Sequence, residues 1–292
     1  MSAREYIRQA YRFLLPLLYG RSRFKLFLKT SLEDIDLTVR QIACVTDSLS
    51  PALRPIRIHP PFGKSMLVIA PHQDDETIGC GGVMALQARS GGAVSIVLLT
   101  DGAFEADQVG MTRQELTALR NQESRSAAAA LGVQEPIFLD HPDLVAEPGR
   151  IADQLAEILR SRKIDVVFTP FLLDGHFEHR QANSIVAQAL GQAGGNIRVL
   201  GYEVWGFAIP NVIVAIDDVM ELKTRALECF HFANRAVDYT WTTRGVNMYR
   251  SRLTEVGICR YAECFFETPA EEFIELAGRI QAAELASLPA TS

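Results

Sequence analysis

Unbroken apolar runs that alternate with helical stretches constrain the fold of this chain more than any other feature. The runs Ser65–Ala70, Ala93–Thr100 and Asp165–Thr169 each have glycine or proline on at least one side and have strand length. Runs of this kind are typical of parallel strands that are buried on both faces. The other expected elements are helices near residues 82–89, 113–131, 151–160, 179–190, 219–231 and 270–285, and strands near 199–205 and 212–216. This order predicts a Rossmann-like, doubly wound, mostly parallel α/β sheet with helices on both faces.

The beginning of the chain predicts a separate helical extension. One helix is expected near Ala3–Leu18 and another near Leu32–Leu49, followed by a proline-rich connector over residues 51–61. We therefore expect an N-terminal helical extension with its connector over residues 1–62, and one large domain over residues 63–292.

The first expected helix is basic and amphipathic. Met1–Thr30 contains seven Lys or Arg and the single acid Glu5, so the rest of the chain is more acidic than the net charge of −6 suggests. That balance argues against a nucleic-acid partner. A basic amphipathic helix can lie in an anionic membrane interface, which would suit a lipid-linked substrate. It can also dock its apolar face on the large domain or on a second subunit, and we expect this second arrangement.

Targeting and redox features are consistent with the cytoplasm. The apolar patch Phe13–Tyr19 is short and is followed by basic residues instead of a signal-peptide cleavage site. The five cysteines are widely scattered and lack CxxC pairing, which fits reduced thiols that are not zinc ligands. We expect a cytoplasmic protein, or one that is peripheral at the inner face of the membrane.

The densest polar cluster follows directly after the first apolar run. His72 is followed by Gln73 and by three consecutive acids, Asp74, Asp75 and Glu76. Because the carboxyl edge of a parallel sheet forms the ligand crevice, this position favours function. Adjacent carboxylates repel one another unless a cation or hydrogen bonds compensate them. Asp is also favoured as a helix N-cap, which is the structural alternative for this pair.

A second polar cluster follows the run Asp165–Thr169. It contains two histidines three residues apart, His176 and His179, with Asp174 and Glu178 beside them. One histidine and one carboxylate from the first loop, with one histidine from the second, would make a three-ligand site with an open position for water. Such a set suits catalytic zinc better than magnesium, which prefers oxygen ligands.

These motifs resemble those of the PIG-L/LmbE-like zinc-dependent N-deacetylases. That family has a His-Pro-Asp-Asp-Glu loop after the first strand and a His-Xaa-Asp-His loop further on. The resemblance covers roughly Leu67–Asp217 and includes Thr100-Asp101-Gly102 and Arg120-Asn121-Gln122-Glu123. It implies one Zn²⁺ per chain, and it implies site residues with distinct roles: His72, Asp75 and His179 as ligands, Asp74 as general base, and His176 facing the developing oxyanion and the leaving amine.

Two residues depart from the family pattern. Gln73 replaces the usual proline, which removes a constraint on φ but no ligand. Glu178 replaces the usual aspartate between the two histidines, so any supporting role of that carboxylate is left open.

The remaining site candidates carry alternatives. Arg120 lies on an amphipathic helix, where arginine usually marks a solvated face or a salt bridge, but the resemblance makes it a candidate substrate contact. Tyr202 and Trp205 could wall a sugar ring, although buried strand aromatics are commoner. Asp101 either accepts a hydrogen bond behind the site or caps the next segment. Asp174 is placed to orient one of the two loop histidines.

The resemblance implies removal of the N-acetyl group from an amino-sugar substrate of the N-acetylglucosaminyl type, giving a free amine and acetate. One alternative is an amidase of the same fold that acts on a bulkier sugar-linked amide. Another is a carbohydrate-binding homologue that has lost catalysis, although Asp74 and the expected ligands are all present. A dinucleotide-dependent oxidoreductase is disfavoured because Gly79-Cys80-Gly81-Gly82 lacks the GxGxxG spacing.

Overall fold

The structure is a computed structural model that describes residues 55–254 and 257–287. The two helices expected near Ala3–Leu18 and Leu32–Leu49 lie outside these residues. In the described part, no helix has a stretch long and apolar enough to cross a bilayer.

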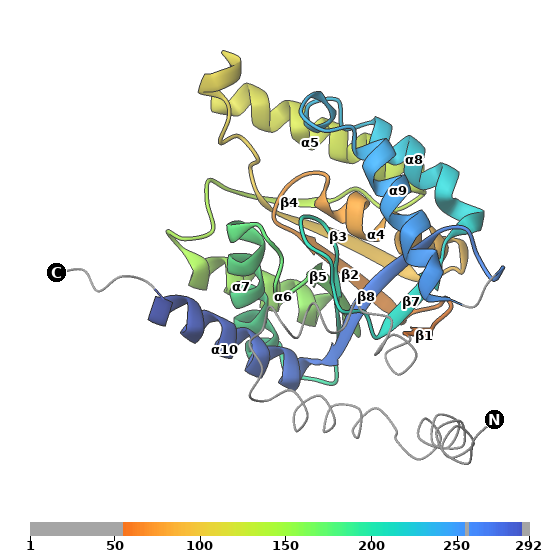
Figure 1. Ribbon diagram of the computed structural model, residues 1–292. Helices are drawn as coiled ribbons and strands as arrows, with labels where there is room; N and C mark the ends of the chain where they lie inside the picture. Colours follow the sequence, from red (N-terminus) through yellow and green to blue (C-terminus); the bar gives the residue numbers. More distant parts are fainter. Residues whose placement is uncertain (1–54, 255–256, 288–292) are drawn as a thin grey trace. The chain divides into compact units, whose positions relative to one another are not determined.

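An eight-stranded sheet forms the centre of the described domain, with strand order β1-β7-β8-β6-β5-β2-β3-β4 (Figure 1). The strands are β1 (Ile56–Arg57), β2 (Ser65–Ala70), β3 (Ala93–Thr100), β4 (Ile137–His141), β5 (Val166–Pro170), β6 (Arg198–Tyr202), β7 (Val212–Ala215) and β8 (Ala262–Pro269). Strands β6, β5, β2, β3 and β4 are parallel to one another, and β1 is parallel to β7. Only β8 pairs antiparallel in this sheet, with β6 and β7. The expected mostly parallel sheet is therefore confirmed.

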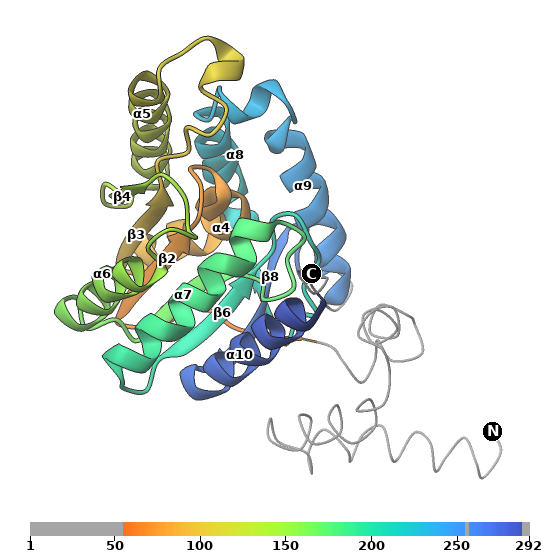
Figure 2. The ribbon, with the colours of Figure 1, turned by 90° about the vertical axis from the view of Figure 1, so that its left-hand side faces the viewer.

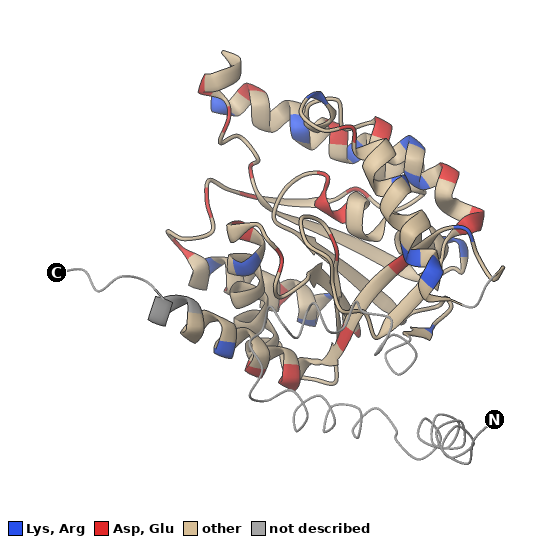
Figure 3. Cartoon of the chain, in the orientation of Figure 1, with Lys and Arg blue, Asp and Glu red and all other residues tan. Residues whose placement is uncertain are grey.

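Helices cover both faces of the sheet, as the sequence predicted (Figure 2). They are α4 (Asp75–Arg89), α5 (Arg113–Leu131), α6 (Pro148–Ser161), α7 (Phe177–Ala193), α8 (Met220–Glu228), α9 (Tyr239–Arg250) and α10 (Ala270–Ser287). Helices α4, α5 and α8 contribute to one hydrophobic core, and α6, α7 and α10 contribute to the other. In Figure 3, Lys and Arg are interspersed with Asp and Glu along the outer helices.

Strand β2 shows why its sequence has no polar alternation. Met66 and Val68 pack into the core on the α4 side, while Leu67 and Ile69 pack into the core on the α7 side. Successive side chains of a strand point to opposite faces, so a strand that is covered on both faces must be apolar throughout.

Some residues before the expected boundary at residue 63 take part in the sheet and the core of the large domain. Ile56 and Arg57 pair with β7, and Phe62 is buried in the core. Helix α4 also begins at Asp75, well before the helix that the sequence predicted near residue 82. Residues 79, 81 and 82 of this helix are glycines. At these positions the side chains of Tyr202, Lys223 and Ile216 come too close to leave room for a Cβ atom.

The sheet order brings the two polar loops together. Strands β2 and β5 are hydrogen-bonded neighbours, with Met66 opposite Val166 and Val68 opposite Phe168. Because they run in the same direction, the loops that follow them leave the sheet at the same edge. Both polar clusters therefore lie side by side at the carboxyl edge, as expected.

Candidate active site

The loop between β2 and α4 contains a strained residue directly before the helix begins. Asp74 has φ 126°, a conformation that non-glycine residues rarely adopt. Its carbonyl oxygen accepts hydrogen bonds from Thr77 and Ile78, and its own N–H donates to the carboxylate of Glu76 at 3.1 Å. Strain of this kind persists only where surrounding contacts hold it, and it concentrates at functional sites.

Three of the predicted site residues converge on one carboxylate oxygen. Oδ2 of Asp75 lies 3.1 Å from Nδ1 of His72 and 3.2 Å from Nε2 of His179, and it accepts a hydrogen bond from the His72 backbone N–H at 3.0 Å. All three residues are buried. The histidine and carboxylate from the first loop and the histidine from the second are therefore brought together as the sequence predicted.

The other nitrogen of each imidazole faces a second carboxylate. Nε2 of His72 lies 2.7 Å from Oε2 of Glu178, and Nδ1 of His179 lies 3.1 Å from Oδ1 of Asp174. Metal-bound histidines almost always have such a partner, which fixes the ring orientation. Asp174 thus accompanies His179, a choice that the sequence left open, and Glu178 supports His72 even though it replaces the usual aspartate.

The donor set fits a divalent metal ion. Nε2 of His179 is buried and, although it lies 3.2 Å from Asp75, it has no hydrogen bond of good geometry within the described residues. His72, His176 and His179 each offer a ring nitrogen, and these atoms lie within 4.8 Å of one another. Buried polar atoms are seldom left unpaired, so the convergence of imidazole nitrogens and a carboxylate favours a cation between them.

The carboxylates around His72 and His179 also favour positive charge at this site. Burial alone would lower the pKa of His179, but the negative charges of Asp75 and Asp174 raise it to about 10. Burial likewise opposes protonation of His72, but its hydrogen bonds to Asp75 and Glu178 raise its pKa to about 9. Although burial favours a neutral Asp75, the charges and hydrogen bonds of both histidines hold its pKa well below the usual range.

Asp74 lies in a different environment from Asp75. Burial, together with the charge of Asp75, raises the pKa of Asp74 to about 7. Its carboxylate is 3.8 Å from the guanidinium of Arg120, which donates to the carbonyl oxygens of Gln73 at 2.8 Å and Gly102 at 2.9 Å. Arg120 is buried, and these contacts give it a role in holding the loop and the charge of Asp74; its contact with a substrate stays a prediction.

His176 lies beside His72 and His179 and contacts both of their rings. Its ring centroid is 5.1 Å from that of His72 and 4.8 Å from that of His179. Burial and the positive charges of His179 and His72 lower its pKa. The indole of Trp205 stacks against it at 6.3 Å and is 56% exposed, so Trp205 lies where a substrate could contact it.

Two other predicted residues have their hydrogen bonds with groups outside this cluster. Tyr202 is fully buried, and its hydroxyl donates to the carbonyl oxygen of Ile69 at 2.9 Å, so the core explanation holds and the predicted substrate contact does not. Asp101 pairs with Arg113 and accepts from the N–H of Ala103 at 3.0 Å, which matches the capping alternative.

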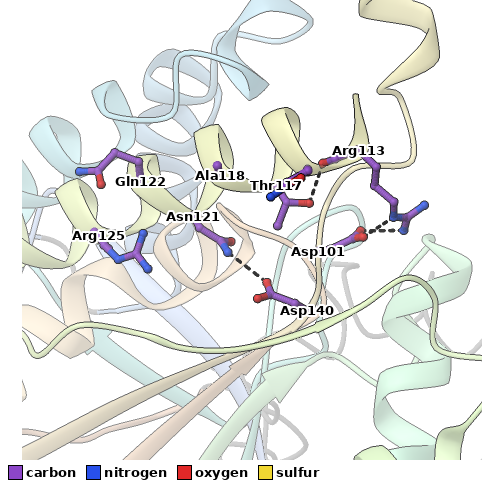
Figure 4. Close-up of a pocket in the computed structure, with 9 residues that line it drawn as sticks. Asp101, Arg113, Thr117, Ala118, Asn121, Gln122, Arg125 and Asp140 are labelled. Atoms are coloured by element: carbon purple, nitrogen blue, oxygen red, sulfur yellow. Dashed lines mark hydrogen bonds and ion pairs between the residues drawn. The ribbon is translucent and has the colours of Figure 1, made fainter. Parts of the chain in front are cut away.

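Asp101 belongs to a separate open groove on α5 (Figure 4). There Asn121 donates to Asp140 at 3.0 Å, and its amide oxygen accepts from the side chain of Gln73 at 2.9 Å. Gln73, which replaces the family's proline, is thus held in place by a hydrogen bond to the side-chain amide of Asn121. This contact joins residues far apart in the sequence, so no local signal could have revealed it.

Together, the fold and this site define an α/β enzyme with a histidine–carboxylate centre at the carboxyl edge of its sheet. The family model described as PIG-L, GlcNAc-PI de-N-acetylase, matches residues 67–190. The chain is also 30% identical over 192 residues to the diacetylchitobiose deacetylase of Thermococcus kodakarensis, which covers 59% of this chain and 71% of that protein. The chain belongs to the PIG-L family, and the resemblance drawn from the motifs is confirmed.

Solved structures show the same fold. The N,N'-diacetylchitobiose deacetylase from Pyrococcus horikoshii, complexed with an inhibitor, has a TM-score of 0.63 and 25% identity, and the match covers 82% of this chain and 96% of that one. GalB, the 4-carboxy-2-hydroxymuconate hydratase of Pseudomonas putida, has a TM-score of 0.57 at 23% identity and covers 70% of this chain and 96% of that one. A shared fold therefore does not fix the reaction, which must be argued from the site.

Proposed function

We propose that this protein is a zinc-dependent hydrolase that removes the N-acetyl group from an amino-sugar substrate, giving a free amine and acetate. The observation that carries the proposal is the convergence of His72 and His179 on Asp75, with a second carboxylate behind each imidazole. The deacetylase relatives support the reaction class, and their names place amino sugars among the substrates of such enzymes.

His72, Asp75 and His179 would hold one Zn²⁺ per chain. Two imidazoles and one carboxylate are a common set for catalytic zinc, which keeps a further position open. Zinc held there supplies Lewis acidity, which lowers the pKa of water and polarises a carbonyl oxygen. Asp174 and Glu178 fix the two imidazoles in the orientation that points one nitrogen of each toward Asp75.

Asp74 is the general base in this proposal. It is adjacent to Asp75 but makes no hydrogen bond to either ligand histidine within the described residues. A carboxylate with a pKa of about 7 is well matched to removing a proton from water at neutral pH. Arg120, at 3.8 Å, limits how far that pKa can rise, because it favours the charged form.

His176 faces the amide that is hydrolysed. Its imidazole donates a hydrogen bond to the carbonyl oxygen as negative charge develops there. When the ring is protonated it also gives a proton to the departing nitrogen, and the lowered pKa that burial and neighbouring charges produce makes this transfer easier. Its Nδ1 atom is buried and has no hydrogen-bond partner in the described chain.

The test combines metal analysis with acetate release from N-acetylated and N-propionylated amino sugars. Purified protein should contain about one zinc per chain, and alanine variants of His72, Asp75 and His179 should each lose it. Asp74→Asn should keep the metal and lose about a hundredfold or more of the turnover. Full zinc occupancy in all three alanine variants would overturn the ligand assignment. Faster release of propionate than of acetate would favour the amidase that acts on bulkier amides.

A further inference from the structure

Gln73, the residue directly before Asp74, is bound to helix α5 at two points. Its backbone carbonyl oxygen accepts from the guanidinium of Arg120 at 2.8 Å, and its side-chain Nε2 donates to Oδ1 of Asn121 at 2.9 Å. The same Nε2 donates to the carbonyl oxygen of Thr100 at 3.2 Å. Gln73, Arg120 and Asn121 are all buried. Two consecutive residues of one helix therefore hold both the main chain and the side chain of Gln73.

Asp140 fixes the direction of the Asn121 amide. Nδ2 of Asn121 donates to Oδ1 of Asp140 at 3.0 Å, at the groove drawn in Figure 4. An ionised carboxylate only accepts hydrogen bonds, so the NH₂ group of Asn121 must face it and the amide oxygen must face Gln73. That oxygen in turn requires the NH₂ group of Gln73. The exposed carboxylate on β4 thus sets the orientation of two buried amides in series.

The amide oxygen of Gln73 shows that this orientation has a cost. Oε1 of Gln73 is buried and has no hydrogen-bond partner among the described residues. A Cβ atom at Gly102 would lie 2.0 Å from this oxygen, so the oxygen fits only because residue 102 is a glycine. Native structures keep few buried acceptors without a partner, because each one reduces stability. The contact with Asn121, which holds the side chain in this direction, explains the exception.

The restraint acts next to an unusual backbone conformation. Asp74 has φ 126°, and its N–H and carbonyl groups are held on the far side by Glu76 and by the first turn of α4. Gln73 holds the near side through α5. A catalytic group that is displaced by about 1 Å can lose a hundredfold in rate, so both restraints matter for a base that must meet a water molecule.

From these contacts we infer that Asn121 is a positioning residue for the proposed reaction. Through Gln73 it holds Asp74 where its carboxylate takes the proton of the attacking water. Within the described chain, the side chain of Asn121 has its hydrogen bonds with Gln73 and Asp140, and not with the residues proposed to bind zinc. The inference rests on the proposed function, and it predicts an effect on turnover instead of on metal or substrate binding.

The first experiment measures kcat, KM and bound zinc of the full-length protein, with the N-acetylated amino sugar that the wild type hydrolyses best. Asn121→Leu, which removes both hydrogen bonds at similar volume, should lower kcat about ten- to a hundredfold. KM should stay close to that of the wild type, and the zinc-saturated variant should keep its metal. Gln122→Leu is the control and should keep the wild-type kcat, because this neighbouring residue of α5 lines the same groove but is exposed.

A double-mutant cycle tests whether Asn121 acts through Gln73. Gln73→Met keeps the length of the side chain but cannot donate a hydrogen bond, so it should lower kcat by a factor similar to that of Asn121→Leu. The double variant should lose no more than either single variant, because both changes break the same contact. Asp140→Asn should cause a smaller loss alone and none in the Asn121→Leu background. Losses that multiply would overturn the inference.

Hydrogen exchange separates this inference from the proposed reaction. Peptides that cover residues 71–79 should exchange faster in Asn121→Leu than in the wild type or in Gln122→Leu. A wild-type kcat in folded Asn121→Leu, even with a lowered Tm, would overturn the inference and leave the proposed function intact. Loss of zinc from the saturated variant would also overturn it. Faster exchange in Asn121→Leu, with no acetate release by the wild type, would support the restraint on the loop and contradict the proposed function.

Discussion

A buried ion pair beneath α4 provides a stability prediction that the structure makes in detail. Nζ of Lys223 donates to Oε1 of Glu263 at 2.6 Å and to the carbonyl oxygen of Ile78 at 2.7 Å. The same carboxylate accepts from the N–H groups of Gly82 at 2.7 Å and Val83 at 2.8 Å. In a regular α-helix the N–H of Gly82 would donate to the carbonyl oxygen of Ile78, so the pair serves both of these groups of α4.

Lys223→Met should destabilise the protein strongly. The methionine keeps the apolar stem but leaves a fully buried carboxylate without its cation, and breaking a buried pair in this way costs about 3–5 kcal/mol. For a domain of this size each kcal/mol lowers Tm by about 2–4 °C, so the expected shift is roughly 6–20 °C. Urea unfolding followed by circular dichroism, with the thermal midpoint as a second readout, measures the change.

The double variant Lys223→Met/Glu263→Met tests the reasoning. Removing both charges leaves no buried ion, and α4 can then pair Gly82 with Ile78 by its own helical hydrogen bond. The double variant should therefore be more stable than the sum of the single losses predicts, by about 2 kcal/mol or more. Additive losses, or a single-variant cost below about 1 kcal/mol, would refute the account.

Two other predictions concern the site. Asp174→Asn should weaken zinc affinity about 10- to 100-fold because His179 loses its anionic partner. Asp101→Asn, in the separate groove, should leave zinc affinity unchanged. Equal losses of affinity in the two variants, measured by competition with a metal chelator, would contradict this prediction. Asp74 must be ionised to act as a base, and burial and a neighbouring charge raise its pKa to about 7. The kcat/KM should therefore fall as pH decreases below about 7, and a profile that stays flat down to pH 5 would rule out this base.

The regular elements that the sequence predicted best are those with strong local signals. Strands β2 and β3 have the expected limits, and so does α5. Helix α5 begins with a capping box between Thr112 and Glu115 and is capped at its other end by Gly132, which has φ 73°. Each signal is contained in a few consecutive residues, so it can be recognised without knowing the partner elements.

The elements that the sequence did not predict depend on distant partners. Strand β8 contains Glu263 and Glu267, and charged residues of this kind are typical of a surface segment. Both are buried in the structure because Lys223 and Arg198 pair with them. Strand β4 is short, and most of its residues remain partly exposed at the edge of the sheet. Neither the ion pairs nor the edge position can be read from composition.

The same distinction applies to the site. The proximity of His72 and His179 could be predicted because each follows a parallel strand, and the sheet topology determines which loops lie at the same edge. The direction of individual side chains was not predictable. Tyr202, at the end of β6, points into the core against Gly79, whereas Trp205, in the loop beyond the strand, stacks on His176. The pleat of the strand and the path of the following loop set these directions.

The division of roles between Asp74 and Asp75 is itself a consequence of the fold. Two adjacent carboxylates would titrate alike in an unfolded chain. Here Asp75 pairs with two imidazoles, whereas Asp74 pairs with neither. The unusual φ of Asp74 turns the chain between them, at a cost of about 1–3 kcal/mol that the hydrogen bonds around Gln73 and Glu76 offset. Their pKa values are therefore driven in opposite directions, and that separation is what allows one carboxylate to bind a metal while its neighbour accepts a proton.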